Sequence, residues 1–408
     1  MITALGRAAP MPSRPVAFAI AAAAGTAILT AASAPAPLYP TYQRLWHFST
    51  FTLTVVFAVY VAALLVALLT VGALSDRVGR RPVASASLLV LAVGMLVFAG
   101  ADGTGALIAA RVLQGLAVGA ATGTLTAMIV DAAPTSRSGA IVSSAVPSLG
   151  IAVGAVLAGG LVEYAPLPRQ LVFWVLAAVD LALAALVWRV GERSEDRPVP
   201  RESLLRSLLP TAGLPREVRP TFLALLPLIC AAWALAGLYL SLGSSVIGGV
   251  LGVEDHFVVG VVLAVFFVAG IAGTALASTV PERLRSVAGA AVLAVGVGVT
   301  TAATLLGALP LYAVGSAIAG IGYGATFRQI IDALGREAPG HQRSQVFATM
   351  YIVSYAAFSV PALGAGLAVG VWGLQRTAVA YGALVVALVA VAALVHFHAG
   401  KRTAAVTG

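Results

Sequence analysis

The chain has 408 residues, of which 60% are hydrophobic and only 10% charged, and its mean hydropathy is +1.00. An average soluble domain has roughly 25% charged residues, so this sequence cannot build a water-facing surface of ordinary size. Disorder is excluded as well, because disordered chains combine low hydrophobicity with high charge. The composition predicts an all-α polytopic membrane protein.

Single residue types exclude several kinds of chemistry. Cys230 is the only cysteine, so no intrachain disulfide or cysteine-based zinc cluster can form. Lys401 is the only lysine, and Arg402 follows it instead of the serine or threonine that completes a Walker A loop. We therefore expect no cofactor and no bound metal. The net charge of +9 is interpreted as arginine at a cytoplasmic membrane surface and not as a nucleic-acid-binding signal.

Twelve stretches are long and apolar enough to cross a bilayer, which takes about 20 residues at 1.5 Å per residue. They are predicted at Pro15–Ala36, Phe51–Val71, Val83–Ala101, Gly105–Ile129, Gly139–Val162, Gln170–Trp188, Thr221–Ser244, Phe257–Ser278, Ser286–Leu306, Leu311–Ile331, Val346–Gly370 and Gln375–His396.

The placement of arginine predicts the orientation, because basic residues gather in cytoplasmic loops. Only Arg44, Arg169 and Arg376 fall in predicted outer segments, and Arg111 falls inside a span. The remaining 20 of the 24 basic residues lie in predicted inner segments. Both termini are therefore predicted to be cytoplasmic.

The first span also has the form of a signal peptide, since Pro15–Ser33 is followed by the small residue Ala34. The charge pattern does not separate the two interpretations, because either one leaves residue 35 outside. An internal repeat favours a retained helix, since cleavage would leave the span at Thr221–Ser244 without a counterpart.

A polar, proline-containing stretch divides the chain into two halves. The predicted organisation is a six-helix half at 1–189, a cytoplasmic linker at 190–219 and a second six-helix half at 220–408.

The two halves also resemble each other in sequence. Gly115–Gly119 matches Gly320–Gly324, and Arg80 matches Arg285, in the same order along the chain. Two apolar blocks of six helices can align by chance, so the repeat is one argument among several. Two such halves with a substrate path between them are typical of secondary transporters.

The loop after the second predicted span reads Gly72-Ala-Leu-Ser-Asp76-Arg77-Val-Gly79-Arg80-Arg81-Pro82. It resembles the GxLxDrxGrr signature of the major facilitator superfamily, in its residues and in its place between the second and third spans. The resemblance implies the twelve-helix fold and transport by alternating access. It also implies a conformational latch that includes Asp131 at the end of the fourth span. The latch residues are Gly72, Asp76, Arg77, Gly79, Arg80, Arg81 and Asp131, with topology signalling as the alternative for Arg77 and Arg81.

Arg111 lies inside the fourth predicted span, and Gln114 follows one helical turn later. The run from Arg111 to Gly115 resembles the RxxQG element of the same family, which implies a place at the central cavity and a link to proton coupling. A buried arginine costs about 2.5–3.5 kcal/mol on insertion scales, so partners must offset that cost. The alternative is a side chain that reaches back to the outer surface.

Asp180 is the only acidic residue near the middle of a predicted span. Burial favours the neutral form of a carboxyl group, which is what a proton carrier needs. Sixth spans in the resembled family usually brace the bundle, so a structural aspartate is an equally good interpretation. Arg111, Gln114 and Asp180 are the candidates for proton coupling.

The fifth span resembles the antiporter element GxxxGPxxGG through Gly150, Gly154 and Gly159. Ala155 replaces its proline and Ala158 the first glycine of the final pair, which weakens the inference to drug–proton antiport. Close packing of small residues is the alternative.

Polar and aromatic residues at helical spacing are candidates for the substrate cavity, although aromatic side chains in membrane helices often serve packing or interface anchoring. The candidates are Thr26, Thr30, Ser33, Pro147, Ser244, Tyr323, Phe327, Tyr351 and Tyr355.

The leading hypothesis is a secondary transporter in a bacterial cell (inner/plasma) membrane that exports hydrophobic or amphipathic compounds in exchange for protons. Uptake of a small metabolite, such as a sugar or an organic anion, is the alternative. A channel would need a repeated pore segment, and an intramembrane serine protease would need a GxSG run; neither is visible. The expected partners are a small-molecule substrate, protons and the lipid bilayer, with the chain acting as a monomer.

Overall fold

The computed structural model describes residues 13–71, 75–190 and 212–407. The side chains of residues 76, 77, 282, 283, 286 and 396–407 lie outside this description. Gly72 and most of the predicted linker fall outside it as well. The described residues form helices joined by short turns and contain no strand.

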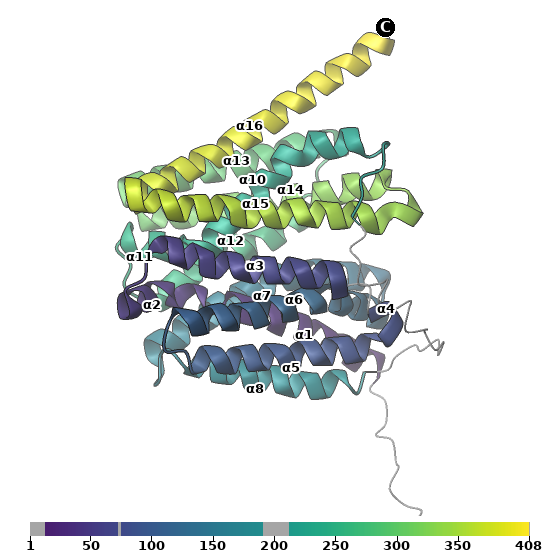
Figure 1. Ribbon diagram of the computed structural model, residues 1–408. Helices are drawn as coiled ribbons and strands as arrows, with labels where there is room; N and C mark the ends of the chain where they lie inside the picture. Colours follow the sequence, from purple (N-terminus) through teal and green to yellow (C-terminus); the bar gives the residue numbers. More distant parts are fainter. Residues whose placement is uncertain (1–12, 72–74, 191–211, 408) are drawn as a thin grey trace, which may run out of the picture.

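The helices follow one another along the chain as in Figure 1. Their bounds are α1 Arg14–Ser33, η1 Ala36–Leu38, α2 Tyr39–Trp46, α3 Thr50–Val71, α4 Ser75–Val78, α5 Arg80–Ala99, α6 Thr104–Ala132, α7 Ser136–Tyr164, α8 Leu171–Val187, α10 Arg219–Ser241, α11 Gly243–Gly249, α12 His256–Leu276, α13 Glu282–Leu306, α14 Leu309–Glu337, η2 Gly340–Gln342, α15 Arg343–Trp372 and α16 Leu374–Thr407.

Every one of the twelve predicted spans coincides with a helix. Ten stretches of the described chain are long and apolar enough to cross a membrane. The other two predicted spans are α8, which has only 17 residues, and α14, whose glycines and polar residues make it less apolar. The prediction of an all-α, multi-pass membrane protein is confirmed.

The end of the first span differs from the prediction. Helix α1 stops at Ser33 and not at Ala36, and a short turn of 3-10 helix and the eight-residue α2 follow. The cause is the run of Pro35, Pro37 and Pro40, because proline lacks the amide hydrogen that a helix interior uses. The predicted seventh span is likewise divided, into α10 and the short α11.

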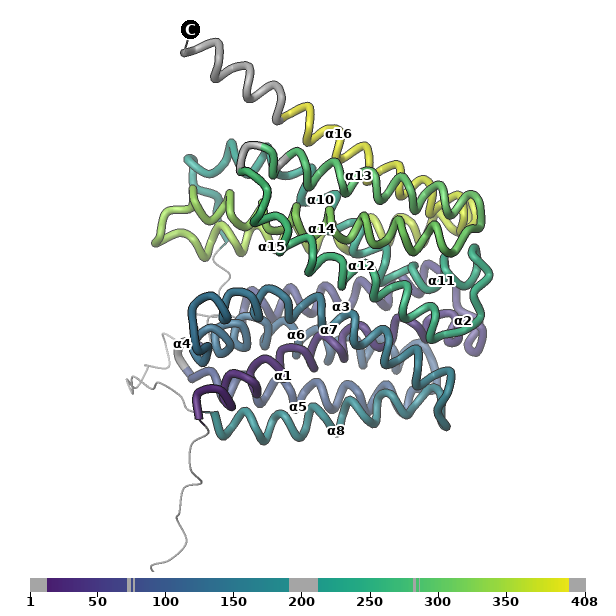
Figure 2. The backbone as a smooth tube through the Cα atoms, turned by 180° about the vertical axis from the view of Figure 1, so that it is seen from behind, coloured from purple at the N-terminus to yellow at the C-terminus, as the bar shows by residue number. Residues whose placement is uncertain are grey.

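The helices pack in two groups that lie one above the other in Figures 1 and 2. Helices α1, α3, α5, α6, α7 and α8 form one group, and α10 and α12 to α16 form the other. The groups meet where α7 packs against α12 and α3 packs against α15.

Matching glycines in the two groups allow matching helix crossings. A Cβ atom on Gly119 of α6 would lie 2.2 Å from the backbone oxygen of Leu64 on α3. A Cβ atom on Gly324 of α14 would lie 1.9 Å from the backbone oxygen of Gly270 on α12. Both crossings bring backbones together as small residues do in membrane helices. The repeated glycine motif of the sequence therefore has the same packing role in both groups.

Hydrogen bonds between the two groups, where both partners are described, lie at the predicted outer ends of the helices. Ser244 of α11 donates to the backbone oxygen of Ala36, at 2.6 Å. His256 of α12 contacts Glu163 of α7 and Thr41 of α2. This conformation is therefore joined at the end that the arginine pattern assigns to the outside, where α2 and α11 lie together in Figure 1.

Candidate functional site

Arg111 of α6 is buried inside the first group, with 2% of its surface exposed. Its Nη1 donates to the backbone oxygen of Ala32 at 3.1 Å and also to the side-chain oxygen of Gln114, and its Nη2 donates to the hydroxyl of Tyr39. The guanidinium carbon lies 5.4 Å from the centre of the Tyr39 ring, 5.2 Å from that of Tyr60 and 5.7 Å from that of Phe98. These distances are within the range of cation–π attraction.

Arg111 therefore meets interior partners and does not reach back to the outer surface as the alternative interpretation required. Gln114 completes the arrangement, because its Nε2 donates to the backbone oxygen of Ala31 at 2.7 Å. Together the two side chains hold the carbonyl oxygens at the end of α1, just before the prolines break the helix. Sequence reasoning missed Tyr39, although the proline run marks the bend that turns it toward α6.

The guanidinium group stays charged at every physiological pH, so it cannot exchange a proton itself. In a site of low dielectric constant it can stabilise a negative charge or hold a helix end in place. Tyr39, Ala32 and Gln114 use several of its donors in this conformation, whereas its Nε has no hydrogen-bond partner among the described residues.

Asp180 of α8 is completely buried, and α8 packs mainly on α5 and α1 of its own group. Neither of its carboxyl oxygens has a hydrogen-bond partner within the described chain, so no hydrogen bond joins it to Arg111. Asp180 and Arg111 therefore lie in the same helix group without being paired. Phe98, whose ring faces Arg111, stacks on Phe173 of α8 at 4.9 Å between ring centres.

The latch candidates lie at the predicted inner end of the same group. Arg80 at the start of α5 forms an ion pair with Asp131 near the end of α6. Gly79 precedes it with φ of 101°, a conformation that favours glycine, and ends the turn between α4 and α5. Arg81 is the next residue of α5, while Gly72 and the side chains of Asp76 and Arg77 lie outside the description.

The second group repeats this pair, which the sequence interpretation did not find. Arg285 of α13 lies 3.8 Å from Asp332 of α14, and Arg328 donates to the same carboxylate at 3.0 Å. The pair within α14 follows from the spacing of four residues, which puts both side chains on one face of the helix. The common signal is an acidic residue near the inner end of the fourth and tenth spans.

We expect Asp131→Asn to lower transport several-fold while the protein still inserts and folds. The two side chains are 31% and 53% exposed, and exposed pairs contribute only about 0.2–1 kcal/mol to stability. A latch adds a second expectation: the double variant Arg80→Gln/Asp131→Asn should be no worse than either single variant, because the two share one interaction. Initial transport rates at matched expression measure this.

Glu217→Gln is the matched control, since it removes an exposed negative charge near the predicted inner face and should leave transport unchanged. Wild-type rates in both Asp131→Asn and Arg80→Gln would contradict the latch.

Aromatic side chains form a continuous wall in the second group. Trp233 of α10 lies edge-on to Phe327, Tyr355 and Phe358, at 6.2, 5.1 and 5.8 Å between ring centres. Tyr323 stacks with Phe327 at 6.4 Å. Tyr351 stacks with Tyr355 at 6.2 Å, and Phe358 contacts Phe57 of α3 in the first group at 5.0 Å. The predicted cavity candidates Tyr323, Phe327, Tyr351 and Tyr355 are thus brought together.

These rings are half-buried, except for Phe358, which is buried. They come from α10, α14 and α15, and the contact with α3 places the wall at the boundary between the groups. Trp233 lies at its centre and was missed by sequence reasoning, because a single tryptophan in an apolar span resembles ordinary packing.

The polar candidates on α1 are used in helix packing. The Thr30 hydroxyl donates to the backbone oxygen of Gly150 at 3.2 Å, and the Ser33 hydroxyl donates to that of Ile151 at 2.8 Å. Thr26 donates within its own helix, to the backbone oxygen of Ala22. Pro147 is an exposed residue inside α7, and Ser244 belongs to the outer contact described above.

The glycines of the fifth span serve two helix contacts. A Cβ atom on Gly154 would lie 2.2 Å from the backbone oxygen of Thr30 on α1, and one on Gly150 would lie 2.6 Å from that of Thr26. A Cβ atom on Gly159 would lie 2.3 Å from the backbone oxygen of His256 on α12. Helix α7 therefore packs closely against α1 within its group and against α12 across the interface.

Known proteins resemble this chain in sequence and in fold. A stretch of 132 residues is 35% identical to the tetracycline resistance protein, class C, of Escherichia coli, and it spans 32% of this chain and 33% of that relative. A bacterial homolog of the human lysosomal transporter Spinster, in an inward-facing and unoccupied conformation, has 16% identity and a TM-score of 0.73, over 95% of this chain and 98% of that one. The human organic anion transporter MFSD10 (TETRAN) has 17% identity and a TM-score of 0.64, over 93% of this chain and all of that one.

The likeness to the two solved transporters concerns the fold, and the sequence match to the tetracycline resistance protein covers about a third of that protein's length. The model of the Major Facilitator Superfamily matches residues 21–362, which is most of the chain. That match agrees with the twelve predicted spans, the two helix groups and the Gly79–Arg81 loop. The chain belongs to the major facilitator superfamily and is a membrane transporter, not an enzyme.

Proposed function

We propose that this transporter exports small hydrophobic or amphipathic compounds across the bacterial inner membrane in exchange for protons, as a monomer with both termini in the cytoplasm. The observation that carries the proposal is the aromatic wall around Trp233, at the boundary between the helix groups. Ring faces bind flat or apolar molecules of many shapes, which suits an exporter of chemically varied compounds. The partial match to a tetracycline resistance protein agrees with this direction.

The charges near the wall favour neutral or anionic substrates over cations. Asp180 is the only acidic residue in the middle of a span, and it is buried in the first group, away from the wall. Arg111 is buried inside its span, whereas Arg328 and Arg376 lie near the ends of theirs. A cation would find ring faces but no carboxylate counter-charge at this depth.

The conformation joined at the predicted outer end is the one that takes up substrate from the cytoplasm. Export then requires the outer contacts of Ser244 and His256 to separate while the inner ends close. Arg80 and Asp131, which are paired within the first group here, lie at the inner end that closes in that second state. This order agrees with the positive-inside pattern, in which Arg80 and Arg285 belong to predicted cytoplasmic segments.

Accumulation of fluorescent probes in cells that lack other exporters tests the proposal. We expect cells that express the protein to retain less N-phenylnaphthylamine, a neutral aromatic probe, and less tetracycline than control cells, and an uncoupler should abolish the difference. Ethidium, a cation, should be affected least. Higher retention in expressing cells than in control cells would indicate uptake. If expressing and control cells retained the same amount of each of the three probes, export of aromatic compounds would be contradicted.

We propose Asp180 as the residue that carries the coupled proton, because it is the only carboxyl group at mid-depth. The group is shielded here, so its proton must exchange in another conformation. Asp180→Asn should preserve exchange of substrate across the membrane and abolish accumulation driven by a pH gradient. An asparagine has nearly the shape of a neutral aspartic acid, so folding should be little changed.

Parallel assays of exchange and of gradient-driven transport in proteoliposomes measure this effect. Full gradient-driven transport by Asp180→Asn would make Asp180 a structural residue and would move coupling to another group.

A further inference from the structure

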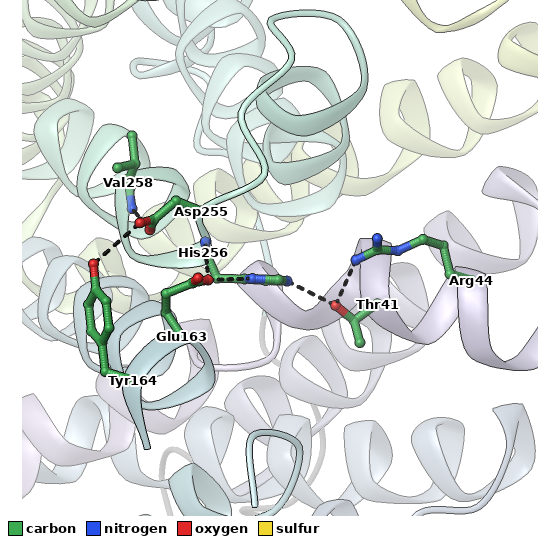
Figure 3. Close-up of polar contacts among 7 residues, drawn as sticks. All are labelled: Thr41, Arg44, Glu163, Tyr164, Asp255, His256 and Val258. Carbon is green, nitrogen blue, oxygen red and sulfur yellow. Dashed lines mark hydrogen bonds and ion pairs between the residues drawn. The ribbon is translucent and has the colours of Figure 1, made fainter. Parts of the chain in front are cut away.

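One polar cluster joins the two helix groups at their predicted outer ends (Figure 3). It is made of the last two residues of α7, two residues from the first turn of α12, the residue that precedes α12, and two residues of α2. Its members are Thr41, Arg44, Glu163, Tyr164, Asp255, His256 and Val258.

The ring of His256 is the centre of the cluster. Its Nδ1 lies 3.0 Å from Oε2 of Glu163, and the backbone N–H of His256 donates to the same oxygen at 3.0 Å. Its Nε2 lies 3.0 Å from Oγ1 of Thr41. His256 begins α12 in the second group, whereas Glu163 and Thr41 lie on α7 and α2 of the first. One side chain therefore bridges two helices of the opposite group.

The neighbouring groups set the charge around this ring. Asp255 caps α12 by accepting from the backbone of Val258 at 2.9 Å, and Tyr164 donates to its other oxygen at 3.3 Å. Arg44 donates to the hydroxyl of Thr41 at 3.5 Å, on the far side from the ring. Glu163 on α7 and Asp255, with Glu254 just before it in the loop, contribute negative charge. Arg44 contributes positive charge, with Thr41 between it and the ring.

We propose that Glu163, His256 and Thr41 form a clasp that holds the outer end closed, and that external pH sets its strength. Histidine is the side chain that changes charge between about pH 5 and pH 8. A neutral ring can donate through one nitrogen only, whereas a protonated ring donates through both and carries a charge opposite to Glu163. The His256 and Glu163 side chains are 20% and 31% exposed, so the ring is accessible from the predicted outer side.

The sign of the effect follows from linkage. Protonation gives the ring a second donor and a charge opposite to that of Glu163, and the contacts with Glu163 and Thr41 exist only while the outer ends are together, so a protonated ring favours the closed state. A ligand that binds one state more tightly shifts the equilibrium toward that state. Acid outside therefore closes the outer end. Because this proton enters and leaves on the same side, the clasp regulates the conformation without carrying protons across, and it is independent of coupling through Asp180.

The distance between two outer positions tests the clasp without any substrate. Spin labels are placed at Gly105→Cys and Leu306→Cys, one exposed outer position in each group, in a Cys230→Ser background in lipid nanodiscs. As the pH falls from about 8 to about 5.5, the short-distance population should rise several-fold. His256→Gln and Glu163→Gln should remove most of this pH response. Thr41→Val, which removes only the Nε2 contact, should give a smaller response than the unmodified clasp.

His341→Gln is the matched control, because His341 lies in η2 at the predicted inner end and should leave the response unchanged. The proposal would be overturned if the wild-type distance distribution did not change with pH, or if it changed in the opposite direction. It would also be overturned if the pH response persisted in both His256→Gln and Glu163→Gln. Thr41→Val keeps the proposal testable if His256→Gln does not fold.

Discussion

Gly159→Ala is expected to lower transport roughly ten- to a hundredfold, because overpacking of this kind costs about 1–3 kcal/mol in the closed state alone. The added Cβ atom would lie 2.3 Å from the backbone oxygen of His256, closer than non-bonded atoms can approach. The contact joins α7 and α12 across the two groups, so each group still folds. The outer ends, however, cannot come together as they do here. A Cβ atom on Gly260 of α12 would likewise lie 2.3 Å from the backbone oxygen of Ala155 on α7.

Initial transport rates, normalised to the amount of folded protein in the membrane, measure this effect. Gly370→Ala is the matched control, since it adds the same methyl group near the outer end of α15 where nothing lies within 4 Å. Gly159→Ala with transport close to that of Gly370→Ala would show that this close crossing is not needed for the transport cycle.

Arg111→Ala is expected to remove most transport and also to destabilise the first helix group. The substitution leaves the Tyr39 hydroxyl and the Gln114 oxygen without the guanidinium donors they now accept from. Each buried polar group that is left without a hydrogen-bond partner costs about 1–3 kcal/mol. The end of α1 also loses the bond to the backbone oxygen of Ala32. Arg111→Lys keeps the charge but not the planar fork of donors, and should restore only part of the activity.

The thermal unfolding midpoint in detergent and the transport rate are measured together for this series. Arg137→Ala provides the comparison, because Arg137 is exposed near the start of α7 and its loss should change neither quantity. A midpoint and rate for Arg111→Ala equal to those of Arg137→Ala would contradict the structural role assigned to the guanidinium group.

The helices could be predicted because each span is a local property of the sequence. Some 20 apolar residues in a row must become a helix in a membrane, since every backbone polar group needs a partner within the segment. The prediction was wrong at the ends of the first and seventh spans. At the first, Pro35, Pro37 and Pro40 form a bend and the separate helix α2. The first span was predicted from its content of apolar residues, and that content does not show where prolines interrupt the helix.

The pairings between distant segments could not be predicted in the same way. The pairing of Asp332 with Arg328 follows from helical spacing, but its other partner, Arg285 on α13, lies far from it in the sequence. Nothing in the run from Asp255 to Val258 indicates that His256 will meet Glu163, because that contact depends on how α7 crosses α12. The RxxQG motif indicated where Arg111 would lie, but its partners, Tyr39 and the end of α1, come from the bend.

The glycine motifs show that one sequence pattern can serve two structural roles. Gly154 and Gly159 belong to a run that resembles an antiporter element, and both allow a helix to approach another backbone. Gly154 serves a contact within the first group, whereas Gly159 serves the contact between the groups. Packing and conformational change are thus served by the same kind of residue, and only its place in the fold separates the two roles.

Proton movement in everted membrane vesicles tests the central claim of proton-coupled export most directly. Respiration acidifies the vesicle interior, and a fluorescent base reports the pH difference. Addition of tetracycline or N-phenylnaphthylamine should release protons from the interior in vesicles that contain the transporter, and the release should be lost in Arg111→Ala. A pH difference that stays unchanged while either compound accumulates in the vesicles would contradict proton exchange.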